Sequence, residues 1–130
     1  GSGSDTITGG NANDILIGGY GADNLSGSNG ADTFFYLGQK DTGDTISGFS
    51  QAEGDRIKFD SAFGFDSSDF MGSISTPGAV DAGKFGYRYD PLTNTTTVYV
   101  DTDGVFGADM EIKLSGNVAL TSGDFLFGGI

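Results

Sequence analysis

The chain has 130 residues, of which 36% are hydrophobic and 24 are glycine, so its length predicts a single domain or one continuous module. Its 18 acidic residues outnumber six basic ones, and the net charge of −12 argues against nucleic acid and anionic membranes and favours multivalent cations. The absence of cysteine and histidine excludes disulfides, thiol nucleophiles, the usual zinc sites and a Ser-His-Asp triad.

Residues 1–35 repeat a nine-residue pattern four times, as GSGSDTIT, GGNANDILI, GGYGADNLS and GSNGADTFF. The recurring aspartates are Asp5, Asp14, Asp23 and Asp32. The recurring apolar residues are Ile7, Leu16, Leu25 and Phe34. Six residues rich in Gly, Asn and Ser predict a turn, and the three that follow each aspartate predict a short strand whose middle side chain points inward.

Two nonapeptides make one coil, so each turn is expected to stack on the turn eighteen residues later. Asp5 then lies over Asp23, and Asp14 over Asp32. Stacked carboxylates repel one another unless a cation lies between them, and Ca²⁺ fits because it accepts six to eight oxygen ligands in irregular geometry. Aspartates often only cap turns, but four in strict register favour a metal.

The pattern resembles the G-G-x-G-x-D-x-U-x nonapeptide of the RTX (repeats-in-toxin) family, whose copies form a calcium-binding parallel β-helix. The resemblance implies that backbone carbonyls and aspartates of two stacked turns hold each ion. The residues implied for one ion are Gly1, Gly3, Asp5, Gly18, Tyr20 and Asp23. The residues implied for a second ion are Gly10, Ala12, Asp14, Gly27, Asn29 and Asp32.

The same count suggests further ions beyond residue 35. Asp41 lies eighteen residues after Asp23, with Gly38 at the preceding carbonyl position. The residues expected for a third ion are Gly19, Gly21, Asp23 and Asp41. Those expected for a fourth are Gly30, Asp32 and Asp44.

The strand residues Ile15, Ile17 and Phe35 should face away from the coil axis, which suggests that another layer covers that side. The segment 33–59 then closes the repeats. Its sequences DTISGF and GDRIKF resemble the downstream part of serralysin-type C-terminal domains, with Gly48 in place of an acid and Arg56 in place of a lysine.

The rest of the chain predicts short helical structure and then antiparallel hairpins. Residues 60–71 predict one short helical turn or loop with Ser67 as its N-cap, and residues 76–83 predict a linker. Alternating apolar residues predict strands near 84–89, 96–100 and 110–114. Asp101 and Asp103 lie in a DTDG sequence that lacks the spacing of an EF-hand and predicts a solvated turn.

The end of the chain, ALTSGDFLFGGI, resembles the C-terminal export signals of type I secreted proteins and also reads as a last core strand over Phe125–Phe127. The expected fold is all-β: a parallel β-roll of calcium-binding nonapeptide repeats over 1–35, continuing upstream, capped by an antiparallel hairpin region over 36–130.

The RTX resemblance implies a calcium-binding C-terminal module of a secreted bacterial protein. Such a module folds on calcium outside the cell, stabilises an upstream domain of the same polypeptide and leaves through type I secretion machinery. The alternative is a module for calcium-dependent adhesion, surface-layer assembly or polysaccharide binding, with calcium-dependent self-association. Catalysis by this chain itself would have to rest on carboxylates alone, so a non-catalytic module is expected.

Overall fold

The computed structural model describes residues 3–37, 43–75, 80–102 and 110–128, and these residues form β-strands and three short 3-10 helices without an α-helix. The strands are β1 (Thr6–Thr8), β2 (Ile15–Leu16), β3 (Asn24–Ser26), β4 (Thr33–Tyr36), β5 (Asp44–Ser47), β6 (Arg56–Phe59), β7 (Phe70–Ser73), β8 (Phe85–Asp90), β9 (Thr95–Val100), β10 (Met110–Ser115) and β11 (Phe125–Phe127). The 3-10 helices are η2 (Ser61–Phe63), η3 (Ser67–Asp69) and η5 (Ser122–Asp124). The all-β prediction is confirmed.

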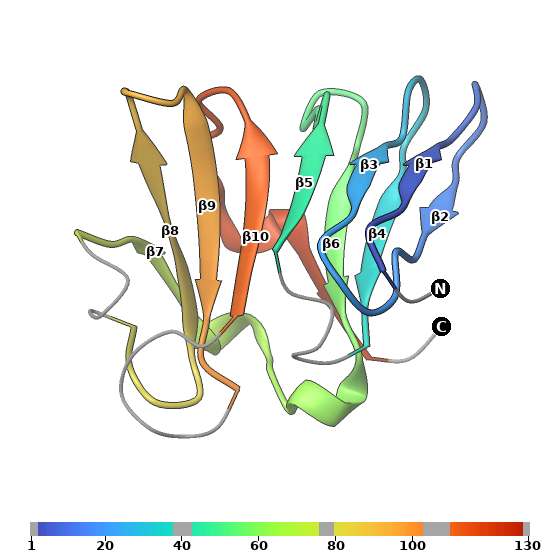
Figure 1. Ribbon diagram of the computed structural model, residues 1–130. Helices are drawn as coiled ribbons and strands as arrows, with labels where there is room; N and C mark the ends of the chain where they lie inside the picture. The colour runs from blue at the N-terminus through green and yellow to red at the C-terminus, as the bar shows by residue number, and fades with distance from the viewer. Residues whose placement is uncertain (1–2, 38–42, 76–79, 103–109, 129–130) are drawn as a thin grey trace.

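The repeats wind into a parallel β-roll, as predicted. Successive strands alternate between a seven-stranded sheet, in the order β1-β3-β5-β10-β9-β8-β7, and a four-stranded sheet, in the order β11-β6-β4-β2. Each repeat strand pairs in parallel with the strand one coil later, with Ile7 opposite Leu25 and Leu16 opposite Phe34. Figure 1 shows the two sheets facing one another at the end that carries β1 to β6.

Both sheets of the roll extend past the last nonapeptide. In the first sheet β5 pairs in parallel with β3, and in the second β6 pairs in parallel with β4. The predicted hairpins are confirmed, since β9 is antiparallel to both β8 and β10. β10 also pairs in parallel with β5, a contact that the strand pattern did not anticipate, and it joins the hairpins to the roll in one sheet.

The predicted inward residues lie in the core. Leu16, Leu25 and Phe34 are buried, and Ile7 at the first strand packs against them while remaining partly exposed. Away from the repeats, the space between the sheets is filled by phenylalanines around Phe85, whose ring centroid lies 4.8 Å from that of Phe125 and 5.2 Å from that of Phe59. Aromatic packing thus compensates for the thin core of the glycine-rich repeats.

The outer face of the four-stranded sheet is only partly covered. Phe35 is buried and Lys58 lies 5.9 Å from the centroid of its ring, but Ile15 is 59% exposed. Ile15, Phe35, Lys58 and Leu126 line a small groove of about 130 Å³. The expectation that another layer covers Ile15 is therefore wrong in the part of the chain that the structure describes, whereas Ile17 is partly buried.

Residues 60–71 contain two helical turns where one was expected. Asp60 caps η2 and Asp66 caps η3, each by accepting a hydrogen bond from the backbone two residues later, so Ser67 begins the second turn and does not cap it. A carboxylate accepts such N–H groups readily at an N-cap. Among the described residues, no helix has the length and apolar character needed to span a membrane.

Candidate metal centre

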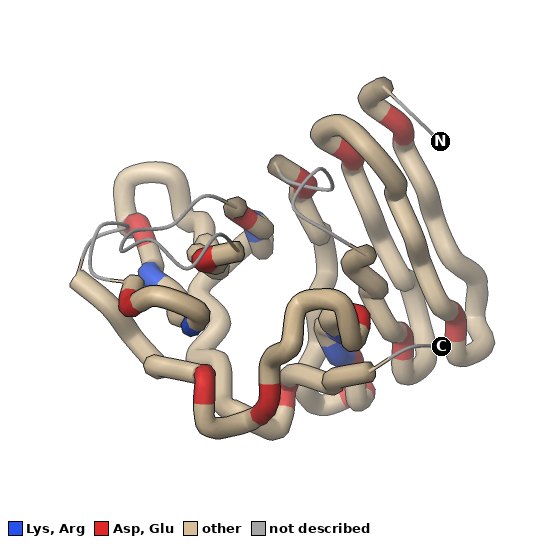
Figure 2. The backbone as a smooth tube through the Cα atoms, turned by 90° about the horizontal axis from the view of Figure 1, so that it is seen from below, with Lys and Arg blue, Asp and Glu red and all other residues tan. Residues whose placement is uncertain are grey.

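The aspartates of the roll form two ladders. We call Asp5, Asp23 and Asp44 the first ladder and Asp14, Asp32 and Asp55 the second. In the first ladder the backbone N–H of Asp5 donates to Asp23 Oδ1 and that of Asp23 to Asp44 Oδ1, both at 2.8 Å. In the second, the N–H of Asp14 donates to Asp32 Oδ1 and that of Asp32 to Asp55 Oδ1, both at 2.9 Å. Figure 2 shows acidic residues at matching corners of successive coils.

The sheets fix this stacking. The residue directly after an aspartate donates its backbone N–H to the carbonyl oxygen of the preceding aspartate in the same ladder. Asn24 donates in this way to Asp5, and Arg56 to Asp32. The same bond recurs from Thr33 to Asp14 and from Thr45 to Asp23. Parallel strand pairing therefore places each carboxylate against the turn of the preceding coil.

Glycines bring carboxylate and carbonyl oxygens together inside the turns. A Cβ at Gly9 would lie 2.6 Å from Asp14 Oδ2 and 2.7 Å from the carbonyl oxygen of Gly27 on the next coil. A Cβ at Gly30 would lie 2.6 Å from the carbonyl oxygen of Ala12. Side chains at these positions would fill the space toward which the oxygens point, so the turns of the second ladder require glycine there.

Each ladder contains a buried carboxylate oxygen that lacks a hydrogen-bond partner among the described residues. These are Asp23 Oδ2 and Asp32 Oδ2, and their residues are 1% and 0% exposed. Burial is the main cause that raises the pKa of Asp32, and the charges of Asp55, Asp14 and Glu53 raise it further, against the hydrogen bond from Asp14. A buried, unpaired acceptor destabilises a fold by about 1–3 kcal/mol, and by more when charged.

These oxygens fit calcium. The donor set is made of carboxylate and carbonyl oxygens, which Ca²⁺ prefers, and no Lys or Arg precedes Lys40 to neutralise the carboxylates. No group of three acidic side chains in the described residues could hold a metal by itself. The repeat pattern predicts that backbone carbonyls supply the other ligands.

Several predicted ligands come together in the structure. Turns 9–14 and 27–32, with the predicted second-ion residues Gly10, Ala12, Asp14, Gly27, Asn29 and Asp32, stack on one another. The described residues of the first set, which are Gly3, Asp5, Gly18, Tyr20 and Asp23, lie on stacked turns of the first ladder, where a Cβ at Gly21 would meet the carbonyl of Gly3. The predicted ligands Gly1, Gly38 and Asp41 lie outside the described residues. These ligand sets stay predictions.

The structure corrects the fourth predicted set. Asp44 was expected beside Asp32 and Gly30, but it lies on β5 in the other sheet and accepts from Asp23 N. Asp32 is paired with Asp55 instead. The nine-residue period missed this pair, because the interval between stacked aspartates, 18 residues within the repeats, is 21 from Asp23 to Asp44 and 23 from Asp32 to Asp55. One signal was present in the sequence: Gly-Asp-x-Ile occurs at 43–46 and again at 54–57.

The glycines of these two motifs have a conformational role. Gly43 and Gly54 have φ of 90° and 93°, a region that favours glycine. A Cβ on Gly43 would lie 3.3 Å from the Cβ of Ala22, and a Cβ on Gly54 would lie 3.1 Å from that of Ala31. These alanines directly precede Asp23 and Asp32, the aspartates that stack on Asp44 and Asp55. The Gly-Asp pairs thus continue the ladders without a full nonapeptide.

Asp101 does not lie in a solvated turn as expected. It is 1% exposed, its N–H donates to the carbonyl of Lys84 at 3.0 Å, and its Oδ2 accepts from the N–H of Gly83. Asp103 lies outside the described residues. Asp101 therefore ties the loop before β8 to the end of β9.

Residues 1–34 match the model of the RTX calcium-binding nonapeptide repeat, in four copies. A comparison with curated proteins found no match. Among solved structures, the chain resembles the AlgE6R2 subunit of the Azotobacter vinelandii mannuronan C5-epimerase, with a TM-score of 0.60 and 24% identity over 95% of this chain and 86% of that one. The AlgE6R3 subunit of the same epimerase gives 0.57 and 22% over 96% and 78%. At these identities the two structures show a shared fold.

Proposed function

We propose, on the premise that residues 1–34 are RTX calcium-binding nonapeptide repeats, that this chain is a non-catalytic module whose β-roll folds when calcium binds outside the cell. The observation that carries the proposal is the pair of buried oxygens, Asp23 Oδ2 and Asp32 Oδ2, without hydrogen-bond partners among the described residues. A cation bound at each ladder would compensate the oxygen there and would cancel the repulsion along that ladder.

The energies support a calcium-dependent transition. Ordering a residue costs about 1–2 kcal/mol of backbone entropy, and a nonapeptide contributes only one inward apolar side chain to the core in return. One site filled at a hundred times its dissociation constant adds about 2.7 kcal/mol. Stacked sites share aspartates, so the coils should order together, as in other repeat arrays.

The β-roll would then remain unfolded at low cytosolic calcium and fold after export. Extracellular calcium sites have dissociation constants of about 10⁻⁴–10⁻³ M, so a cell interior would leave them empty. We propose export by type I secretion machinery and stabilisation of an upstream domain of the same polypeptide as the consequences of this behaviour in a secreted bacterial protein. The serralysin-like character of the C-terminal part remains a prediction.

Circular dichroism of the chain in chelator and during a calcium titration tests the proposal. We expect strand signal to appear cooperatively near millimolar calcium and not with equal magnesium, which requires a tighter octahedral site. A spectrum that is the same in chelator and in calcium would refute the proposal.

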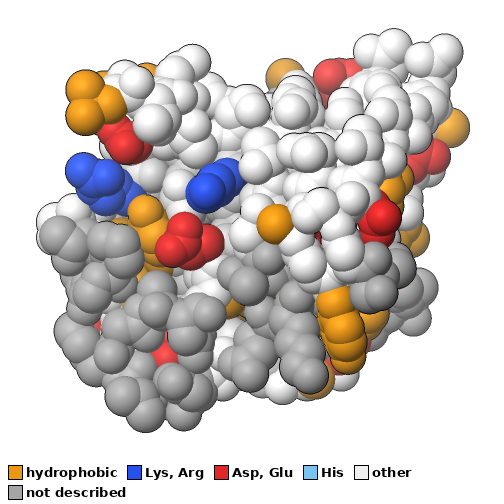
Figure 3. All heavy atoms as spheres, viewed as in Figure 1, with side chains coloured by type: hydrophobic (Ala, Val, Ile, Leu, Met, Phe, Trp, Pro, Cys, Tyr) orange, Lys and Arg blue, Asp and Glu red, His pale blue; other side chains and the backbone are white. Residues whose placement is uncertain are grey.

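A second candidate is binding of a polysaccharide, as the epimerase neighbours suggest. One observation favours it: a groove of about 290 Å³ across β8, β9 and β10 is lined by Arg88, Lys113 and Tyr99, with Asp90 and Glu111. Figure 3 shows the basic side chains of this face over the hairpins and not over the roll. Titration of polymannuronate into ¹⁵N-labelled protein should shift resonances of these strands; shifts that persist in Arg88→Ala/Lys113→Ala would exclude this groove.

Calcium-dependent self-association is the remaining alternative. Sedimentation velocity over the same calcium titration separates it from folding of a monomer, because only association changes with protein concentration.

A further inference from the structure

Asp55 differs from Asp23 and Asp32, the inner aspartates of the two ladders. It is 1% exposed, and both of its carboxylate oxygens accept backbone hydrogen bonds. Oδ1 accepts from Asp32 N at 2.9 Å, and Oδ2 accepts from Ser50 N at 2.8 Å. Asp23 and Asp32 each keep one oxygen without a partner among the described residues. The protein itself therefore already provides a partner for each oxygen of Asp55.

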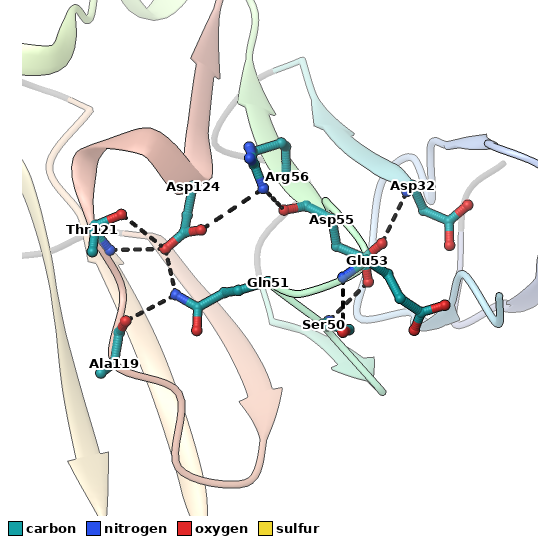
Figure 4. A network of polar contacts seen from close by, with 9 residues as sticks. All are labelled: Asp32, Ser50, Gln51, Glu53, Asp55, Arg56, Ala119, Thr121 and Asp124. Carbon is teal, nitrogen blue, oxygen red and sulfur yellow. Dashed lines mark hydrogen bonds and ion pairs between the residues drawn. The ribbon is translucent and has the colours of Figure 1, made fainter. Parts of the chain in front are cut away.

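The loop that carries Asp55 is closed by its own contacts. The N–H of Asp55 donates to the carbonyl of Ser50 at 3.0 Å, and that of Gly54 to the carbonyl of Gln51 at 3.1 Å. Glu53 Oε1 accepts from the N–H of Gly30 at 3.2 Å, so a carboxylate of the loop also reaches the turn of the fourth repeat. Figure 4 shows Glu53 and Asp55 on this loop beside Asp32.

The C-terminal segment holds the loop from the other side. Asp124, which is 4% exposed, accepts from Gln51 Nε2 at 2.7 Å and from Thr121 N at 2.8 Å. Gln51 Nε2 also donates to the carbonyl of Ala119 at 2.9 Å. Arg56 Nη1 donates to the carbonyl of Asp55 at 2.8 Å and lies 3.9 Å from Asp124 Oδ1. Strand β11 begins directly after Asp124 and pairs with β6, so this network is anchored in the sheet.

We propose that Asp55 is a positioning residue and not a calcium ligand. Asp55 is the last aspartate of the second ladder, and both of its oxygens accept backbone hydrogen bonds. Asp124 holds the loop that carries Asp55, so the coil that contains Asp32 packs against a loop that needs no metal. The proposal rests on the proposed calcium-dependent folding and adds which aspartate closes the ladder. It predicts that neutralising Asp55 changes how tightly calcium binds and leaves the number of ions unchanged.

Calorimetric calcium titration of the whole chain tests this with four variants. We expect Asp32→Asn to bind fewer ions than the wild type. Asp55→Asn and Asp124→Asn should bind the full number with a calcium midpoint raised about three- to tenfold, the effect of one lost hydrogen bond. Asp81→Asn is the control, because this aspartate is exposed and belongs to neither ladder; it should titrate as the wild type.

The outcomes separate the possibilities. An Asp55→Asn protein that binds one ion fewer makes Asp55 a ligand and overturns the proposal. Wild-type midpoints in both Asp55→Asn and Asp124→Asn overturn the positioning role. A wild type that binds no calcium would refute the proposed function instead.

Hydrogen exchange of the wild type provides a measurement that does not depend on a folded variant. In chelator, the amides of Ser50, Gly54 and Asp55 should keep protection that those of Asn24 and Thr33 lose, since the loop contacts need no metal. Equal loss of protection in the loop and in the repeats would overturn the proposal.

Discussion

Replacing Gly27 by alanine should impair calcium-dependent folding through one steric contact. A Cβ at Gly27 would lie 2.5 Å from Asp32 Cγ and 2.7 Å from Asp32 Cβ. Ordinary carbon contacts lie near 3.5 Å, so the groups must separate by about 1 Å. Asp32 cannot swing aside freely, because it is fully buried and its Oδ1 accepts from Asp14 N.

Overpacking of this kind destabilises a fold by about 1–3 kcal/mol, and each 1.4 kcal/mol changes an equilibrium constant about tenfold. We therefore expect Gly27→Ala to lower the urea midpoint at saturating calcium and to raise the calcium midpoint several-fold or more. Both are measured by circular dichroism.

Gly10→Ala is the matched control, because a Cβ at Gly10 meets nothing within 4 Å and its φ is not in the left-handed region. Both substitutions reduce the freedom of the unfolded chain by a similar amount, about 0.4–1 kcal/mol, so the comparison isolates the contact with Asp32. Equal midpoints for the two variants would refute the steric reasoning and with it the packing of Asp32 against the turn.

Three further predictions concern the core, the ladder and pH. Phe85→Ala should lower the free energy of unfolding by about 3–5 kcal/mol, because Phe85 is fully buried. Leu92→Ala, at a residue that is 94% exposed, should change it by less than about 0.5 kcal/mol. Equal urea midpoints for the two variants would contradict the central role of the aromatic cluster. Asp32→Asn should favour the folded roll in the absence of calcium, because it removes a buried charge, and a weaker strand signal in chelator than that of the wild type would contradict this. Because the folded-state pKa of Asp32 is raised above 3.8, its destabilising charge is fully present at neutral pH and is lost as pH falls through the raised pKa toward 3.8. The strand signal of the calcium-free wild type, relative to that of Asp32→Asn, should therefore increase as pH falls over that range, and a difference that does not vary with pH would contradict the raised pKa.

The roll and the turn chemistry could be predicted from the repeats, because four copies place glycine, aspartate and an apolar residue at constant intervals. Leu16, Leu25 and Phe34 are in the core as expected, and the hairpin strands β8 to β10 followed from alternation. Asp66 replaced Ser67 as a cap because two acceptors adjoin the same turn, and a carboxylate competes well for its N–H groups. Ile15 remained exposed because periodicity predicts the face of a strand and not what covers that face.

A constant period of nine residues was enough to stack Asp5 on Asp23 and Asp14 on Asp32, since identical local geometry repeated along a chain generates one helical path. The tertiary structure decided how both ladders continue, although Gly-Asp-x-Ile at 43–46 and 54–57 marks the two positions in the sequence. Beyond Phe35 the loops differ in length, so the residue count no longer determines register, and strand pairing chose Asp44 for the first ladder and Asp55 for the second. The contacts of Asp124 with Gln51 join segments 73 residues apart, and no local pattern records a pairing that only the folded sheets bring into reach.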